Sequence, residues 1–164
     1  MKSLRVVPHL VLTLCFSPVF CKAQSPPVPL PLVERVNLAT HVFVGRAKRL
    51  RVRKLVGGRL FKVNAEPAST GINTGLVFEL EVIVEEVLFP NKWKPSKMIK
   101  IIYGGGAFSI ADSRKAFLAG EFVYLTRAAS FGGQTYFVPS YALSLVEELS
   151  KKEEVLAVLR KRAA

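Results

Sequence analysis

Residues 41–55 constrain the fold more than any other segment, because their apolar residues alternate like those of a strand but change phase partway. In the first half, apolar residues occupy both odd and even positions. In the second half, they occupy every other position and alternate with Arg49, Arg51 and Arg53. Gly45 lies just before the change. A glycine beside a phase slip is typical of a strand that bends or bulges. The segment therefore predicts the coiled first strand of a small barrel.

A second strand is predicted over residues 77–88, where apolar residues on one face alternate with glutamates on the other. Its apolar face carries Phe78, Leu80, Val82 and Val84, and the opposite face carries Glu79, Glu81 and Glu85. Glutamates at this spacing are typical of a solvated face that lies opposite basic residues. We expect the arginines of the first strand to be their cross-strand partners, which favours a structural role for these carboxylates over acid–base catalysis.

Turn residues and shorter apolar runs divide the rest of the chain. Residues 64–74 are rich in turn-forming residues and are predicted to be a loop. The other predicted elements are a helix at 32–39, a return strand at 60–63, a strand at 100–103, one or two helical turns within 108–118, and a hairpin of 122–126 with 135–138. The expected fold is mainly β: a five-stranded, partly open Greek-key barrel of the oligonucleotide/oligosaccharide-binding (OB) type, with a short N-terminal helix.

A C-terminal amphipathic helix is predicted over residues 144–164, after a barrel domain at 32–143. Ser144 and Glu147 have the spacing of a capping box. Two i,i+4 pairs are expected to stabilise the helix, Glu147–Lys151 and Glu148–Lys152. Its apolar stripe is formed by Leu145, Leu149, Leu156 and Leu159. We expect this stripe to pack on the barrel; the alternative is docking on a partner helix or an acidic membrane.

The first 23 residues have the character of a signal peptide. Two basic residues precede a short apolar run at 10–16, and small residues end the segment at Ala23. The run is shorter than the roughly 18–20 residues that a transmembrane anchor, the competing interpretation, requires. A lipid anchor fits poorly, because large residues precede both cysteines. We expect cleavage near Ala23, a proline-rich linker at 24–31, and an exported protein that is periplasmic or secreted.

Removal of residues 1–23 would lower the net charge from +12 to about +9 and remove both cysteines. A chain of about 140 residues can bury a core without disulfides. Its positive charge attracts anions: nucleic acid, acidic polysaccharide, lipid headgroups or an acidic protein. Export argues against nucleic acid. Many exported proteins are equally basic without an anionic ligand, so the charge alone leaves both interpretations open.

Few side chains in the expected mature chain could do chemistry. It has one histidine, His41, one aspartate, Asp112, and no cysteine. This inventory cannot assemble a zinc or iron site from His and Cys, and no nucleophile motif accompanies it. His41 is expected to be a half-exposed structural residue, and Asp112 to cap a helical turn. The sequence predicts a protein that is not an enzyme and uses no cofactor or metal; a glycosidase-like pair of glutamates is the remaining route to catalysis.

Two stretches could bind anions. Residues 46–62 contain eight basic residues and no acid, and Trp93 lies among lysines, which suggests an exposed aromatic. OB barrels hold single strands or sugars in cationic grooves with stacking aromatics. The alternative is that these cations are simply solvated or paired with the glutamates. The candidate ligand-binding residues are Arg49, Arg51, Arg53, Trp93 and Lys94.

Three segments together resemble a known family. They are Leu32-Val-Glu-Arg-Val-Asn-Leu-Ala-Thr-His-Val-Phe-Val-Gly-Arg46, Val77-Phe-Glu-Leu-Glu-Val-Ile-Val-Glu-Glu-Val-Leu88 and Ala119-Gly-Glu-Phe-Val-Tyr-Leu-Thr126. Their order is similar to that in the OB-type domain of tissue inhibitors of metalloproteinases (TIMPs) and netrin modules, in the cysteine-free form found in uncharacterised exported bacterial proteins. The resemblance covers roughly residues 32–138. The animal inhibitors act through an N-terminal cysteine, whereas the expected mature end here is Gln24, so no inhibitory residue is carried over.

The leading hypothesis is an exported, non-enzymatic OB-type module that binds a protein or an anionic polymer, such as a polysaccharide of the cell envelope. The alternative, implied by the resemblance, is a TIMP-like inhibitor of metalloproteases. Peripheral contact with a membrane is a further option for the basic C-terminal helix. The sequence leaves the ligand and the oligomeric state open.

Overall fold

The computed structural model describes residues 30–65, 69–70, 75–90, 92–104, 108–141 and 145–163. The expected signal peptide, residues 24–29 of the expected linker, and Ser144 of the expected capping box lie outside the described residues. So do residues 66–68 and 71–74 of the expected loop.

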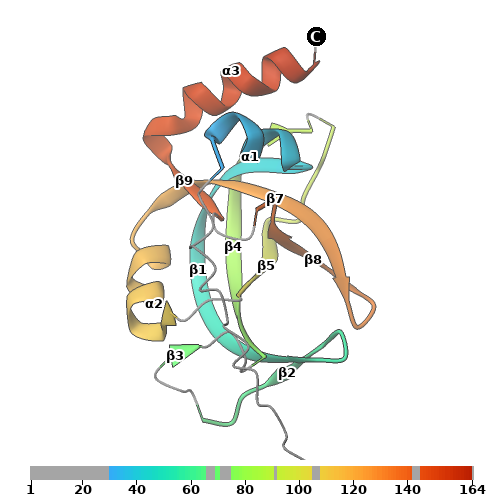
Figure 1. Cartoon of the computed structure of the whole chain (residues 1–164), viewed down its shortest axis with the longest axis vertical. Coiled ribbons are helices and arrows are strands. Elements are labelled where there is room, and N and C mark those ends of the chain that lie inside the picture. The colour runs from blue at the N-terminus through green and yellow to red at the C-terminus, as the bar shows by residue number, and fades with distance from the viewer. Residues whose placement is uncertain are drawn as a thin grey trace, which may run out of the picture.

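The described chain is mainly β, as the sequence predicts, with helices at both ends (Figure 1). The predicted strands and the short first helix are confirmed, although most strands run longer than expected. The elements are α1 (Leu32–Leu38), β1 (His41–Val56), β2 (Arg59–Lys62), β3 (Ser69–Thr70), β4 (Leu76–Phe89), β5 (Met98–Gly104), β6 (Phe108–Ser109), α2 (Ile110–Leu118), β7 (Glu121–Phe131), β8 (Gln134–Pro139), β9 (Val146–Glu148), a 3-10 turn η1 (Leu149–Lys151) and α3 (Lys152–Ala163).

Seven strands form one sheet in the order β2-β1-β4-β5-β8-β7-β9, and β1 also pairs with β7. That extra pairing closes a ring through β1, β4, β5, β8 and β7. Neighbours in the ring are antiparallel except β5 and β8, which run parallel and pair, among the described residues, through Ile101 and Phe137 alone. The ring is therefore least well joined between β5 and β8.

A bulge in β1 explains the phase change in its sequence. Ala47 lies opposite Val82 and Arg49 lies opposite Glu81, so Lys48 is an extra residue with no partner of its own on β4. One extra residue moves every later side chain to the other face of the strand. The side chains that reach the interior of the ring are thus Phe43 and Ala47 before the bulge, and Leu50 and Val52 after it.

The first half of β1 is buried on both faces. Its inward face joins the main core, which fills the ring and includes Phe78, Leu80, Val82, Ile101, Tyr124 and Phe137. Its outward face carries Val42 and Val44, which pack in a second core beneath the two terminal helices with Val36, Ala39, Val123, Leu125, Val155 and Leu159. Apolar residues on both parities of this half therefore serve two separate cores.

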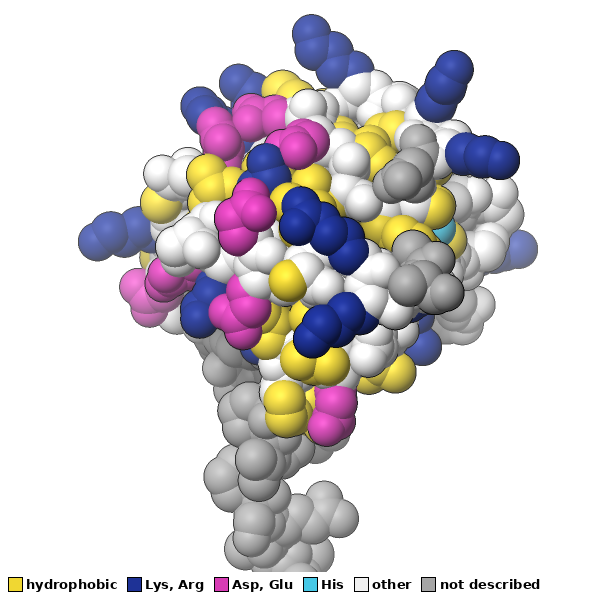
Figure 2. Space-filling view, turned by 90° about the horizontal axis from the view of Figure 1, so that it is seen from above, with side chains coloured by type: hydrophobic (Ala, Val, Ile, Leu, Met, Phe, Trp, Pro, Cys, Tyr) yellow, Lys and Arg dark blue, Asp and Glu magenta, His cyan; other side chains and the backbone are white. Residues whose placement is uncertain are grey.

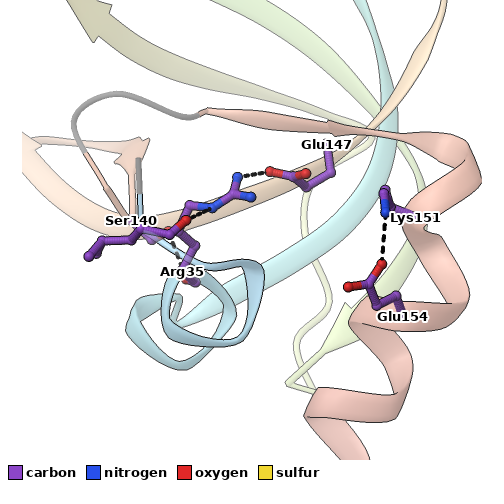
Figure 3. A network of polar contacts seen from close by, with 6 residues as sticks. Arg35, Ser140, Glu147, Lys151 and Glu154 are labelled. Atoms are coloured by element: carbon purple, nitrogen blue, oxygen red, sulfur yellow. Dashed lines mark hydrogen bonds and ion pairs between the residues drawn. The ribbon is translucent and has the colours of Figure 1, made fainter. Parts of the chain in front are cut away.

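Helix α1 is fastened to the end of the sheet by Arg35. Its guanidinium forms an ion pair with Glu147 on β9, and its Nε donates to the Leu30 carbonyl at 2.9 Å (Figure 3). The Ser140 hydroxyl, just after β8, donates to the Arg35 carbonyl at 3.2 Å. One residue of α1 thus connects segments that are more than a hundred positions apart in the sequence.

The predicted start of the C-terminal helix is wrong. Glu147 lies in β9, so it forms neither a capping box nor a helical pair with Lys151. Helix α3 begins at Lys152, whose ammonium pairs with Glu86 of β4 at 2.6 Å instead of with Glu148. Lys151 pairs with Glu154 at 3.0 Å. The cause is tertiary pairing of β9 with β7, which outweighs the local helical pattern.

The predicted apolar stripe is divided in the same way. Leu145 belongs to the main core and Leu149 is exposed, whereas Leu159 and its neighbour Val155 pack in the second core. Arg162 on α3 donates to the Ala39 carbonyl at 2.7 Å, just after α1. Helix α3 therefore packs on its own domain, as expected.

Helix α2 follows β6 directly and is capped by Ser109. The Ser109 hydroxyl accepts a hydrogen bond from the Asp112 amide at 3.3 Å, so Ser109 is the N-cap and Asp112 sits in the first turn. The prediction that Asp112 itself caps the helix is wrong. A carboxylate in the first turn still interacts favourably with the helix dipole.

Gly45 lies where the backbone of β4 approaches β1 too closely for a side chain. A Cβ atom at this position would lie 2.5 Å from the Ile83 carbonyl oxygen and 2.9 Å from Val82 Cγ1. We predict that Gly45→Ala lowers the free energy of unfolding by about 2 kcal/mol, because the backbone oxygen cannot yield without breaking the ladder. Gly120→Ala, which meets nothing within 4 Å, is the matched control. Urea titration followed by Trp93 fluorescence measures both; equal midpoints would contradict the argument.

Tyr124 carries an unsatisfied hydroxyl in the main core. Its ring stacks on Phe43 at 5.1 Å, its oxygen has no hydrogen-bond partner among the described residues, and burial raises its pKa. Tyr124→Phe is expected to leave stability unchanged or to raise it by about 1 kcal/mol, since a buried unpaired hydroxyl is costly. The comparison is Thr126→Val, which removes a buried hydroxyl that donates to the His41 carbonyl at 3.0 Å and should cost about 1 kcal/mol. A loss for Tyr124→Phe as large as for Thr126→Val in thermal unfolding would refute this assignment.

Candidate binding surface

The arginine row of β1 lies directly over two glutamates of β4. Arg51 is opposite Glu79 and Arg49 is opposite Glu81, as the sequence predicts. Glu79 accepts a hydrogen bond from Arg53 at 2.9 Å and lies 3.7 Å from Arg51. Glu81 lies 3.2 Å from Arg51 and 3.9 Å from Arg49. The three arginines and two glutamates form one alternating network.

The expectation that these glutamates lie on a solvated face is wrong. Glu79 is 1% exposed and Glu81 is 8% exposed. Each carboxylate is covered by arginines that approach from the neighbouring strand, and the guanidinium groups replace the water it would otherwise bind. Glu85, farther along β4, is exposed and pairs at 3.8 Å with Arg46. The buried carboxylates are therefore structural acceptors with no open face toward a substrate.

The arginine row borders a groove of about 560 Å³, which we call the β1 groove. Its lining comprises residues 49–53 of β1, Lys62 of β2, the following Val63, and Arg114 of α2. Among the described residues, each ionisable side chain that lines it is basic. Arg49 is the most exposed of the three arginines, with 59% of its side chain exposed, whereas the Arg53 side chain is 19% exposed.

Trp93 lies apart from the β1 groove. The indole packs edge-on against His41 at 4.7 Å and lies 5.4 Å from Phe137 and 5.7 Å from Phe43. The predicted exposed aromatic is therefore half-buried at the edge of the main core. With Lys94 it lines a second pocket of about 530 Å³, the Trp93 pocket, whose wall also contains Lys100 and Phe137.

The structure thus divides the five predicted site residues into two groups. Arg49, Arg51 and Arg53 line the β1 groove, and Trp93 and Lys94 line the Trp93 pocket; the two sites share no lining residue. The strand register shows how the two sites lie relative to each other. Glu81 on β4 lies opposite Arg49 on β1 and, on its other side, opposite Lys100 on β5. Directly opposite residues share a face of the sheet. The backbones of Arg49 and Lys100 are therefore two strand spacings, about 10 Å, apart across β4.

The remaining polar candidates have structural surroundings. His41 lies at the start of β1, its Nδ1 is 2.9 Å from the Thr40 hydroxyl, and burial lowers its pKa. Arg46, part of the predicted basic stretch, is bound to Glu121, and this hydrogen bond lowers the pKa of Glu121. Within the part of the chain that the structure describes, no three His, Cys, Asp or Glu side chains are placed to share a metal ion.

Arg114 also lines the β1 groove, although it was not among the residues predicted from the sequence. Lys62 belongs to the predicted basic stretch, but Arg114 is 52 positions away on α2 and reaches the β1 groove because α2 packs beside β1. No local pattern marks it. Charge alone would not have found it either: seen from the end that carries α1 and α3, basic side chains project at the top, left and right of the view, whereas acidic ones lie mostly on its left (Figure 2).

Comparison of the chain with protein-family models, with curated proteins and with solved structures found no match. In the described residues, none of the helices combines the length and the apolar composition required to cross a bilayer.

The buried network yields a prediction about stability. Replacing Glu79 with Gln leaves the Arg53 guanidinium, whose Nε already lacks a hydrogen-bond partner among the described residues, without its carboxylate. We expect Glu79→Gln to lower the free energy of unfolding by about 2–3 kcal/mol. Glu85→Gln on the same strand, which weakens an exposed pair, should cost less than about 1 kcal/mol. Chemical denaturation at low and high salt measures both; a loss for Glu79→Gln that is no greater than for Glu85→Gln would contradict a buried ionic role.

Proposed function

We propose that the protein is an exported, non-enzymatic binding module of the OB type whose ligand is anionic, either an acidic protein or an acidic polymer of the cell envelope. Export rests on the signal-peptide character of residues 1–23. The observation that carries the ligand class is the β1 groove, whose ionisable lining consists of basic residues from three elements, β1, β2 and α2.

The strand order supports the OB type. The five ring strands, β1, β4, β5, β7 and β8, are the first to fifth in chain order. Around the ring they follow the order first, second, third, fifth, fourth, and the fourth pairs with the first. The third and fifth are the parallel pair, and α2 lies between the third and fourth. A five-stranded, partly open ring with a Greek-key path is the pattern of OB barrels. The order is also what the resemblance to TIMP-type domains implies.

The site is suited to binding rather than to reaction. The two carboxylates nearest the β1 groove are buried under arginines, so they hold the cations in place and do not face the groove. Guanidinium groups held in fixed positions bind carboxylate, sulfate or phosphate oxygens in pairs. Among the described residues, the ionisable side chains that line the groove are basic, and such a lining attracts an anionic chain.

The metalloprotease-inhibitor alternative rests on the resemblance alone. In the animal inhibitors the residues that act are at the N-terminus, and the expected mature end, Gln24, lies outside the described residues. No described residue favours this alternative over simple anion binding.

The test compares charge removal inside and outside the β1 groove. Arg49→Gln with Lys62→Gln removes two groove cations and leaves the Glu79 pairs intact. Binding of polyglutamate and of a sulfated polysaccharide, measured by fluorescence anisotropy at 50 mM salt, should weaken about tenfold, since each exposed contact contributes up to about 1 kcal/mol.

The control variant, Lys97→Gln with Lys161→Gln, loses the same charge at exposed positions that do not line the groove. Its affinity should change less than about twofold. Equal weakening in the two variants would show that net charge, not the groove, attracts the polyanion, and the proposal would fail.

A further inference from the structure

β1 has a gap in its pairing beside the β1 groove. On one side it pairs with β4 from Val42 to Lys54. On the other side it pairs with β7 as far as Arg46 and with β2 from Arg53 onward. Among the described residues, nothing pairs with residues 47–52 on that second side. A gap of six residues is about 20 Å of strand edge without a described neighbouring strand.

Within the described chain, the backbone groups on this side of the gap have no partner in the sheet. The Leu55 amide donates to the Gly75 carbonyl at 2.7 Å, on the β4 side. Because successive residues of a strand direct their N–H and C=O groups to opposite sides, those of Val52 and Leu50 point toward the gap. These two residues line the β1 groove. Such an edge is a template for an added strand.

The side chains around the gap define what such a strand would carry. Arg49, Arg51 and Arg53 lie on the outward face of β1, so the outward side chains of an added strand would meet a row of guanidinium groups. Leu50 and Val52 face the main core on the other side, next to Val63. Acidic residues are therefore favoured at alternate positions, with apolar residues between them.

We propose, building on the proposed function, that the ligand is an extended acidic segment of another protein, which joins the sheet as a strand at the open edge of β1. Main-chain hydrogen bonds to Leu50 and Val52 provide the register, and alternating carboxylates pair with the arginine row. The proline-rich residues 24–29 of this chain do not suit the edge, because they contain no acid and Pro26, Pro27 and Pro29 have no N–H to donate.

The experiment uses the whole chain and a labelled peptide, acetyl-Glu-Val-Glu-Val-Glu-Val-amide. Three companion peptides separate the contribution of the backbone from that of charge. The first is a block peptide of the same composition, Glu-Glu-Glu-Val-Val-Val. The second is the alternating peptide with N-methyl groups on the backbone nitrogens of its valines. The third carries the N-methyl groups on the backbone nitrogens of its glutamates. The alternating peptide should bind at least tenfold more tightly than the block peptide. One of the two methylated forms, the one that loses its N–H groups on the β1 side, should bind at least tenfold more weakly than the other.

Amide hydrogen exchange provides a second readout. Saturating alternating peptide should slow the exchange of the Leu50 and Val52 amides at least tenfold and leave that of Arg127, on β7, unchanged.

The outcomes distinguish this inference from the proposed function. If the block peptide or both methylated peptides bind as well as the alternating one, strand addition is overturned, while charge-dependent binding in the β1 groove stands. Tight binding of a sulfated polysaccharide together with no binding of any peptide overturns it as well and identifies a polymer ligand. If Arg49→Gln with Lys62→Gln changes no affinity at all, both the inference and the proposed function fail.

Discussion

The bulge at Lys48 is the constraint on which the rest of the structure depends. β1 pairs with β7 at its start, with β2 at its end and with β4 along most of its length, so it must bend strongly. Without the extra residue, the odd-numbered positions that face the core at Phe43 would continue to face it. Leu50 and Val52 would then point to solvent and the arginines would point inward. The bulge therefore decides both which residues form the core and which face carries the cations.

The arginine–glutamate network then converts an edge of the sheet into a fixed charge pattern. Burying two carboxylates is costly, and an apolar pair in their place would often be at least as stable. The ion pairs hold flexible arginine side chains in defined positions, which lowers the conformational entropy lost when a ligand binds.

The sequence predicted what depends on local pattern and failed where distant segments compete. The phase change beside Gly45 and the alternation of residues 77–88 predicted two strands and the cross-strand pairing of arginine with glutamate. Glu147, by contrast, has good helical spacing, yet it pairs with Arg35 of α1, a partner that no local pattern indicates. The aromatic surroundings of Trp93 come from β1 and β8, so the lysines beside it in sequence gave a misleading picture of its exposure.

Where the chain is described, β5 and β8 share one residue pair, and this has a mechanical consequence. Elsewhere the ring is held by ladders of at least six pairs, so the energy needed to separate two strands is lowest at this junction. We therefore expect thermal fluctuation to open the ring at this junction before it opens elsewhere along its circumference. Since Ile99, Lys100 and Phe137 flank the junction, we expect the width of the Trp93 pocket to change with this opening, while the long β1–β4 ladder holds the opposite wall in place.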